Sequence, residues 1–330
     1  MNAKIICTLG PSSYKKNILN IFKKEGVDIF RINLSHTPKK DIEKKIIFLK
    51  KNRIKNICLD TEGAQVRVSI LEKKVFLKKN KIIKILCGNK KTTSNKIFLS
   101  PKFDLDKIKK NTLIFIGFES LIVKIVKKHK FKDFLYGKVI KSGLLESRKG
   151  VHIDQKIKLQ PISEKDYFAL NLALKYKLNY FAISFVNNHK DILQVKQIIG
   201  KNNFIISKIE TLDAIRDLKK ISKESSALLI DRGDLSRYVP IEKIPIAQDK
   251  ILKQSKIFGK PVYIATNLLE TMIDTNLPTR AESNDIYSCL DKGARGLVLA
   301  AETAIGKYPV ECVKFLNRCI GAFKNRKNFL

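Results

Sequence analysis

Eight short apolar stretches, each followed by a segment with helical periodicity, constrain the fold of this chain more than any other feature. The stretches are rich in β-branched residues and lie at residues 5–7, 29–34, 57–59, 180–184, 204–209, 227–230, 262–265 and 296–300. Helical patterns follow at about residues 14–25, 39–51, 164–176, 188–199, 211–222, 243–257, 282–291 and 309–324. Alternating strands and helices are typical of a parallel sheet, and eight repeats predict an α/β chain folded as a (β/α)8 TIM barrel.

The helical periodicity of apolar residues is interrupted between the third predicted strand and the third predicted helix. Residues 68–149 instead carry β-rich runs at 75–77, 113–115 and 121–123, separated by turns rich in Lys and Asn. We therefore expect a small inserted β-barrel lid domain at residues 68–149 on a catalytic barrel formed by residues 1–67 and 150–330. A lid excludes water from a reaction, although an inert insertion would give the same pattern.

The net charge of +35 is large enough to raise the question of a nucleic-acid partner. Only eleven of the 66 basic residues are Arg, and the Lys residues are spread through nearly every segment together with many Ile and Asn. A nucleic-acid footprint usually gathers its charge on one face and uses Arg for recognition. The distribution therefore favours compositional drift and disfavours nucleic acid as a partner.

Neither a secretory signal nor a membrane span is expected from the hydropathy pattern. The apolar run at residues 5–7 is too short for a signal, and the chain has no apolar run of about 18 residues. We expect a cytoplasmic protein without a membrane partner.

Polar residues close nearly every predicted strand, where barrel enzymes carry their chemistry. Glu210 and Asp234 would end adjacent strands, and two such carboxylates can share Mg²⁺ or Mn²⁺ while leaving positions open for substrate oxygens. Lys208 would point into the same region because it lies two residues before Glu210 on one strand. These residues predict a divalent-metal site, although a Lys-x-Glu pair on a strand is often only a solvated pair.

Cations and backbone donors near this site suit a phosphorylated carboxylic acid. Arg31 can bind phosphoryl oxygens in a bidentate fork, and Lys208 adds a point charge. The segment that includes Gly233 and Asp234 offers successive N–H groups for an anion, or equally a simple turn. Thr266 could hydrogen-bond or relay a proton, or cap the next helix.

A second oxygen-rich cluster carries a single negative charge, which matches a weakly held monovalent cation better than Mg²⁺. A plain hydrogen-bond network is the alternative interpretation of these residues, which are Asn33, Ser35, Asp60 and Thr61.

Nine segments resemble, in order, motifs of the pyruvate kinase family. They are residues 4–12, 31–36, 60–67, 147–151, 206–210, 232–235, 259–262, 278–282 and 302–304. The resemblance implies phosphoryl transfer from phosphoenolpyruvate to ADP, giving pyruvate and ATP in glycolysis. It also implies that the family's carboxy-terminal regulatory domain is absent from these 330 residues, so that control through that domain is not expected. A homo-oligomer formed through the barrel is compatible with the sequence.

The resemblance assigns roles to individual residues. Glu210 and Asp234 would hold the Mg²⁺ or Mn²⁺ ion that bridges the substrate's carboxylate and phosphoryl groups. Lys208 and Arg31 would stabilise the negative charge of the phosphoryl group in transfer, and Arg67 would lie near the phosphates.

Further assignments concern the substrate and a second ion. Gly233, Asp234 and Thr266 would bind the substrate, and Thr266 matches the threonine implicated in protonating the enolate. The matches to the potassium ligands are Asn33, Ser35, Asp60 and Thr61.

Several positions depart from the family pattern. Glu62 replaces a usual lysine, Gln65 stands where members have Glu or Lys according to their need for K⁺, and Asn187 replaces a basic residue. Asp231 stands where a small residue is usual, and its charge could repel the substrate. Potassium dependence and full activity therefore remain open.

Two other functions are compatible with parts of the sequence. A metal-dependent pyruvate-type aldolase barrel would also use Glu and Asp at strand ends, but it leaves residues 60–61 and the lid insertion unexplained. A degenerate basic barrel that binds nucleic acid would account for the charge and the departures.

Overall fold

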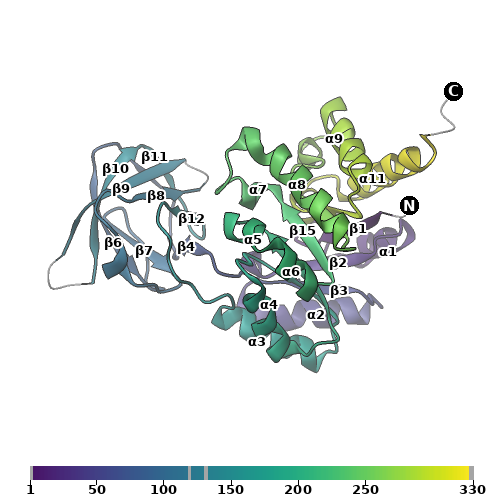
Figure 1. Ribbon diagram of the computed structural model, residues 1–330, viewed down its shortest axis with the longest axis horizontal. Helices are drawn as coiled ribbons and strands as arrows, with labels where there is room; N and C mark the ends of the chain where they lie inside the picture. The colour runs from purple at the N-terminus through teal and green to yellow at the C-terminus, as the bar shows by residue number, and fades with distance from the viewer. Residues whose placement is uncertain (1–2, 118–119, 130–132, 327–330) are drawn as a thin grey trace. The chain divides into compact units, whose positions relative to one another are not determined.

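The protein is described by a computed structural model that covers residues 3–117, 120–129 and 133–326. The chain divides into two compact units, one formed by Met1–Gly63 with Pro161–Leu330 and the other by Ala64–Gln160 (Figure 1). The inserted unit is wider than the predicted 68–149. The reason is that β4 (Val66–Val68) and β12 (Gly150–Ile153) pair with each other and belong to the insertion's own sheet.

The first unit is a closed barrel of eight strands in the order β1-β17-β16-β15-β14-β13-β3-β2. All neighbouring strands are parallel. This architecture confirms the predicted TIM barrel. The strands are β1 (Lys4–Thr8), β2 (Ile29–Asn33), β3 (Ile57–Asp60), β13 (Tyr180–Ile183), β14 (Phe204–Ile209), β15 (Ala227–Asp231), β16 (Val262–Ala265) and β17 (Gly296–Leu299).

Helices follow the barrel strands along the chain. They are α1 (Lys16–Lys24), α2 (Ile42–Lys51), α3 (Glu164–Lys175), α4 (His189–Ile199), α5 (Leu212–Arg216), α6 (Leu218–Glu224), α7 (Arg232–Leu235), α8 (Ile244–Ile257), α9 (Arg280–Asp291), α10 (Ala301–Ala304) and α11 (Pro309–Lys324). Capping boxes start three of them, at Ser163, Asn188 and Thr279. The single helix predicted at 211–222 is two helices, because the chain leaves helical geometry at Asp217, whose carboxylate binds the backbone and ring of His189.

Apolar residues alternate between the two sides of each barrel strand. On β15, Ala227 and Leu229 fill the barrel interior, whereas Leu228 and Ile230 belong to the larger core between strands and helices. Because side chains alternate across a strand with a period of two, each strand serves both cores.

The second unit is an all-β domain built on its own apolar core. Seven strands close a barrel in the order β10-β6-β7-β4-β12-β8-β9, and β11 pairs with β5 beside it. Its other strands are β5 (Val75–Leu77), β6 (Ile82–Cys87), β7 (Lys96–Ser100), β8 (Leu113–Ile116), β9 (Leu121–Lys128), β10 (Leu135–Lys141) and β11 (Gly143–Leu145). The predicted inserted β-barrel is therefore present.

Across residues 3–117, 120–129 and 133–326, every helix is too short or too polar to cross a bilayer.

Candidate active site at the carboxyl end of the barrel

The inward positions of the barrel strands change from apolar to charged as the strands end. On β15, Asp231 continues the inward row of Ala227 and Leu229, and on β14, Lys208 follows Ile206. The same period of two places Arg31 after Ile29 on β2 and Asp60 after Cys58 on β3. The predicted gathering of polar residues at the strand ends is thus produced by the barrel geometry itself.

Lys208 lies at the centre of this charged layer. Its Nζ is 2.9 Å from Glu210 Oε1, 3.4 Å from Asp231 Oδ2 and 3.6 Å from Asp60 Oδ2, and it donates to Ser184 Oγ at 3.2 Å. Burial alone would lower the pKa of Lys208, but the three carboxylates outweigh it and raise that pKa. The side chain therefore stays a cation inside the barrel mouth.

Arg31 supplies the second buried cation. Its Nη1 lies 3.3 Å from Asp60 Oδ2, and both side chains are at least 95% buried. The Nε of Arg31 is buried without a hydrogen-bond partner in the described parts of the chain. An unsatisfied guanidinium donor is costly, so this atom suits an anionic ligand that would supply the missing acceptor.

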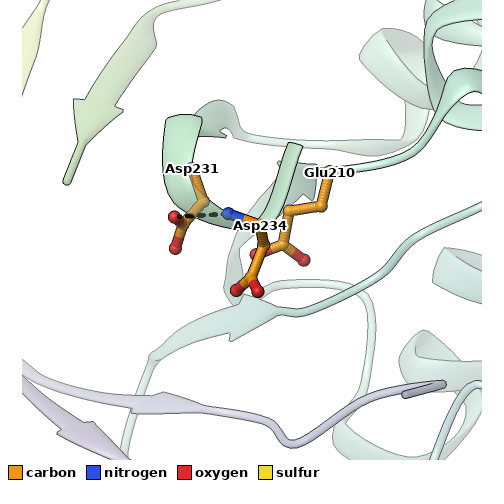
Figure 2. A group of neighbouring side chains, drawn as sticks. All are labelled: Glu210, Asp231 and Asp234. Carbon is orange, nitrogen blue, oxygen red and sulfur yellow. Dashed lines mark hydrogen bonds between the residues drawn. The ribbon is translucent and has the colours of Figure 1, made fainter. Parts of the chain in front are cut away.

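Three carboxylates form the candidate metal centre. Glu210, Asp231 and Asp234 each offer an oxygen within 4.8 Å of the others (Figure 2). Glu210 directly follows β14, Asp231 ends β15 and Asp234 lies in α7. Asp234 Oδ1 also pairs with Arg237 Nε at 3.0 Å. Oxygen-only donors of this kind fit a hard divalent cation such as Mg²⁺.

Glu210 is the most deeply buried member of this group. Its Oε2 accepts a hydrogen bond from Phe185 N at 2.6 Å, whereas its Oε1 faces the ammonium of Lys208 at 2.9 Å. Burial raises the pKa of Glu210 to about 8, against the opposing effect of the Lys208 ammonium. A buried carboxyl group beside two other carboxylates fits a bound cation, which would stabilise its ionised form.

Thr266 lies beside the carboxylates in a left-handed backbone conformation, with φ of 70°. This conformation is strained for a β-branched residue and persists only where its surroundings hold it. The hydroxyl donates to Asp231 Oδ1 at 2.9 Å and accepts from Gly233 N at 3.0 Å. The β15–α7 turn therefore positions Thr266.

Arg232 holds the backbone of Thr266 from the other side. Its Nε and Nη2 donate to the Thr266 carbonyl at 3.1 and 2.6 Å, and its Nη1 donates to both carboxylate oxygens of Asp285 on α9. The sequence did not reveal this clamp. Residues 232 and 285 are far apart along the chain, and neither has a local pattern that signals the contact.

Comparison with known proteins decides the family. The family model described as the barrel domain of pyruvate kinase matches residues 1–313. The chain belongs to the pyruvate kinase family. This membership confirms the predicted family, and with it the expectation of a phosphotransferase with a TIM barrel.

Pyruvate kinases from distant organisms are similar to almost the whole chain. The protein from Thermotoga maritima is 35% identical over 96% of this chain, which spans 70% of that relative. The one from Methanocaldococcus jannaschii is 36% identical over 96% of this chain, which spans 68% of it. A chloroplastic isozyme from Nicotiana tabacum is 30% identical over 95% of this chain, which covers 57% of its length.

The residues predicted to bind potassium have partners within the protein. Asn33 Oδ1 accepts from Ser35 N, and Thr61 Oγ1 accepts from Ser184 N at 3.0 Å. Asp60 faces Arg31 and Lys208 and accepts from Ser184 Oγ at 3.1 Å. Asp60 thus pairs with the two buried cations of the charged layer, and a potassium site stays a prediction.

Arg67, also predicted for the site, lies on β4 of the inserted unit. It is partly exposed, and its Nη1 donates to the carbonyl of Arg148 at 3.2 Å. Its approach to the substrate's phosphates stays a prediction.

Two of the positions that depart from the pyruvate kinase pattern have local partners. Glu62 forms an ion pair with Lys165 at 2.8 Å, and Asn187 Oδ1 accepts a hydrogen bond from Thr211 Oγ1 at 3.0 Å. Asp231 differs from both because it enters the charged layer directly. Lys208, Arg31 and the Thr266 hydroxyl lower the pKa of Asp231 although its burial acts to raise it, so its negative charge is retained.

Proposed function

We propose that this chain transfers the phosphoryl group of phosphoenolpyruvate to ADP in a reaction that depends on Mg²⁺ or Mn²⁺, giving pyruvate and ATP. The arrangement of Lys208 among carboxylates at the ends of adjacent strands carries this proposal. It combines a buried cation for a phosphoryl group with oxygen ligands for a metal in one place. Membership of the pyruvate kinase family supports the same reaction.

Glu210 and Asp234 would hold the divalent cation. When bound, the ion supplies positive charge that neutralises and orients the substrate's carboxylate and phosphoryl oxygens. The donor set fits this role because it consists of carboxylate oxygens that lie within 4.8 Å of one another, which is the kind of ligand that a hard divalent cation prefers.

Lys208 and Arg31 would stabilise the group in transfer. The bond between phosphorus and the enol oxygen breaks, and a terminal oxygen of ADP forms the new bond to phosphorus. Negative charge spreads over the phosphoryl oxygens during this step, and fixed cations in a buried site stabilise that charge without reorganising. The Nε of Arg31, which is without a hydrogen-bond partner in the described chain, is suited to contact such an oxygen.

The enolate left by transfer must gain a proton on its terminal carbon to become pyruvate. Thr266 is the candidate relay because its hydroxyl is held at the strand end between Gly233 and Asp231. Gly233 N, Asp234 N and the Thr266 hydroxyl are the donors we assign to the substrate's carboxylate. A monovalent cation such as K⁺ near Asn33 and Thr61 would add positive charge to the same region.

A coupled assay tests this function. Purified protein is mixed with phosphoenolpyruvate, ADP, lactate dehydrogenase and NADH. Lactate dehydrogenase reduces the pyruvate formed and oxidises NADH, so turnover is measured as a loss of NADH absorbance. Turnover is expected with Mg²⁺ or Mn²⁺ and not with chelator, and a K⁺ series tests the monovalent ion. Protein that is folded by circular dichroism but inactive across the whole series of ions would overturn the proposal.

A further inference from the structure

Asp231 occupies donors that the proposed function gives to the substrate. Its Oδ1 accepts the Thr266 hydroxyl at 2.9 Å and the N–H of Asp234 at 3.4 Å, and the latter contact is drawn in Figure 2. Both belong to the donor set for the substrate's carboxylate. The protein's own carboxylate therefore lies where an external one would bind.

The charge of Asp231 reinforces this competition. The side chain is 9% exposed, so little water screens its repulsion of a second carboxylate. Its Oδ2 lies 3.4 Å from Lys208 Nζ, and this ion pair holds the side chain in place. To bind, the substrate's carboxylate must therefore either lie beside the like charge of Asp231 or displace the Asp231 side chain.

A divalent cation offers Asp231 another place to bind. One of its oxygens lies within 4.8 Å of oxygens of both Glu210 and Asp234. Octahedral ions readily accept a further carboxylate, and three negative charges bind such an ion more tightly than two. Movement of Asp231 toward the ion would release the Thr266 hydroxyl.

We propose that Asp231 is a specificity-determining residue. Its carboxylate competes with the substrate's carboxylate for the same hydrogen-bond donors until a divalent cation binds Asp231 instead. This inference rests on the proposed function, because that function places the substrate's carboxylate at Thr266 and Asp234. The competition couples metal binding strongly to binding of the substrate's carboxylate. The ion increases substrate affinity both by direct contact and by removing a competitor.

Isothermal titration calorimetry with pyruvate and with Mg²⁺ as separate probes tests the inference. The variants are Asp231→Ala, which removes the competitor, and Asp231→Asn, which keeps an acceptor oxygen but loses the charge. The matched control is Asp249→Ala, because Asp249 lies on α8 and pairs with Lys253 at 2.8 Å. Thermal melting shows that each variant is folded.

Without metal, Asp231→Ala should bind pyruvate about tenfold more tightly than the unaltered protein, and Asp231→Asn should gain less. Both variants should bind Mg²⁺ about tenfold more weakly, and saturating Mg²⁺ should reduce the difference in pyruvate affinity to about threefold or less. The control should match the unaltered protein in every titration.

Metal-free pyruvate affinity of Asp231→Ala within about twofold of the unaltered protein would overturn the inference. Undiminished Mg²⁺ affinity in both variants, or no pyruvate binding in any protein with Mg²⁺, would do the same. A different result would overturn the proposed function alone. In that case the unaltered protein does not turn over phosphoenolpyruvate and ADP, while the pyruvate titrations still follow the expected pattern.

Discussion

The ammonium of Lys208 lies 2.9 Å from Glu210 Oε1, on the same strand and two residues away. This contact joins the cation expected to meet the phosphoryl group to a carboxylate expected to hold the metal. Because both side chains are at least 95% buried, the ammonium and the carboxylate attract each other with little screening whenever Glu210 is ionised. A change at either residue should therefore alter both metal binding and catalysis.

Replacement of Lys208 by alanine should abolish most of the activity. It removes a buried positive charge from the transferring group, so kcat/KM should fall by at least about 10²-fold. It also leaves buried carboxylates without their cation, so the free energy of unfolding should drop by about 3–5 kcal/mol. Coupled assays and denaturant unfolding measure the two effects.

Lys196→Ala is the matched control, because Lys196 pairs with a single carboxylate, Glu224, at 2.7 Å. It should leave activity unchanged. Equal losses of activity in the two variants would mean that Lys208 has no special role.

Glu210→Gln should separate metal binding from folding. With a pKa of about 8, the carboxyl group is largely protonated at neutral pH without metal, and glutamine resembles that neutral form. Thermal stability without metal should therefore change by about 1 kcal/mol or less. The increase in melting temperature that Mg²⁺ gives the unaltered protein should disappear. A variant that melts much earlier but still gains stability from Mg²⁺ would contradict this role.

The affinity for Mg²⁺ should rise with pH up to about 8 and then level off. The raised pKa means that the native protein keeps a proton that the unfolded chain loses near pH 4.5, so ionisation of Glu210 costs stability between about pH 4.5 and 8. Mg²⁺ needs the ionised carboxylate and so displaces that proton below pH 8. Calorimetry in buffers of different ionisation enthalpy measures the proton release. An affinity independent of pH from 6 to 9 would rule out this linkage.

Asp285→Asn should lower kcat with little change in KM for ADP. The change weakens the charged hydrogen bonds between Arg232 and Asp285. Arg232 in turn holds the strained backbone of Thr266. A small displacement of a reacting group can cost up to about 10²-fold in rate, and we expect a loss of ten- to a hundredfold in kcat. Steady-state kinetics beside an Asp249→Asn control measure it. Unchanged kcat would show that Thr266 keeps its position without the clamp.

The strand-end chemistry could be predicted from the sequence because it follows from a period of two. Lys208 and Glu210 continue the inward row that contains Ile206, so a correct strand assignment also places their side chains. The barrel follows from eight repeats of one local pattern. Such features depend on neighbours within a few residues, and these are visible in a sequence.

Three other contacts or boundaries could not be predicted. The Arg232–Asp285 clamp depends on how α9 packs beside the turn after β15, and the outer limits of the inserted unit depend on β4 pairing with β12. Asp231 was expected to disturb the site by its charge, but its hydrogen bond to Thr266 depends on a left-handed backbone at residue 266. None of these has a signal in local composition or periodicity.

Phosphorus NMR tests the central claim most directly, because it observes the transferred group without a coupling enzyme. With phosphoenolpyruvate, ADP and Mg²⁺, the signal of the enol phosphate should decay as the γ-phosphate signal of ATP grows in equal amount, and Glu210→Gln should slow this exchange severely. Loss of the enol phosphate signal with growth of inorganic phosphate alone, or no change with folded protein, would contradict the assignment of phosphoryl transfer to this site.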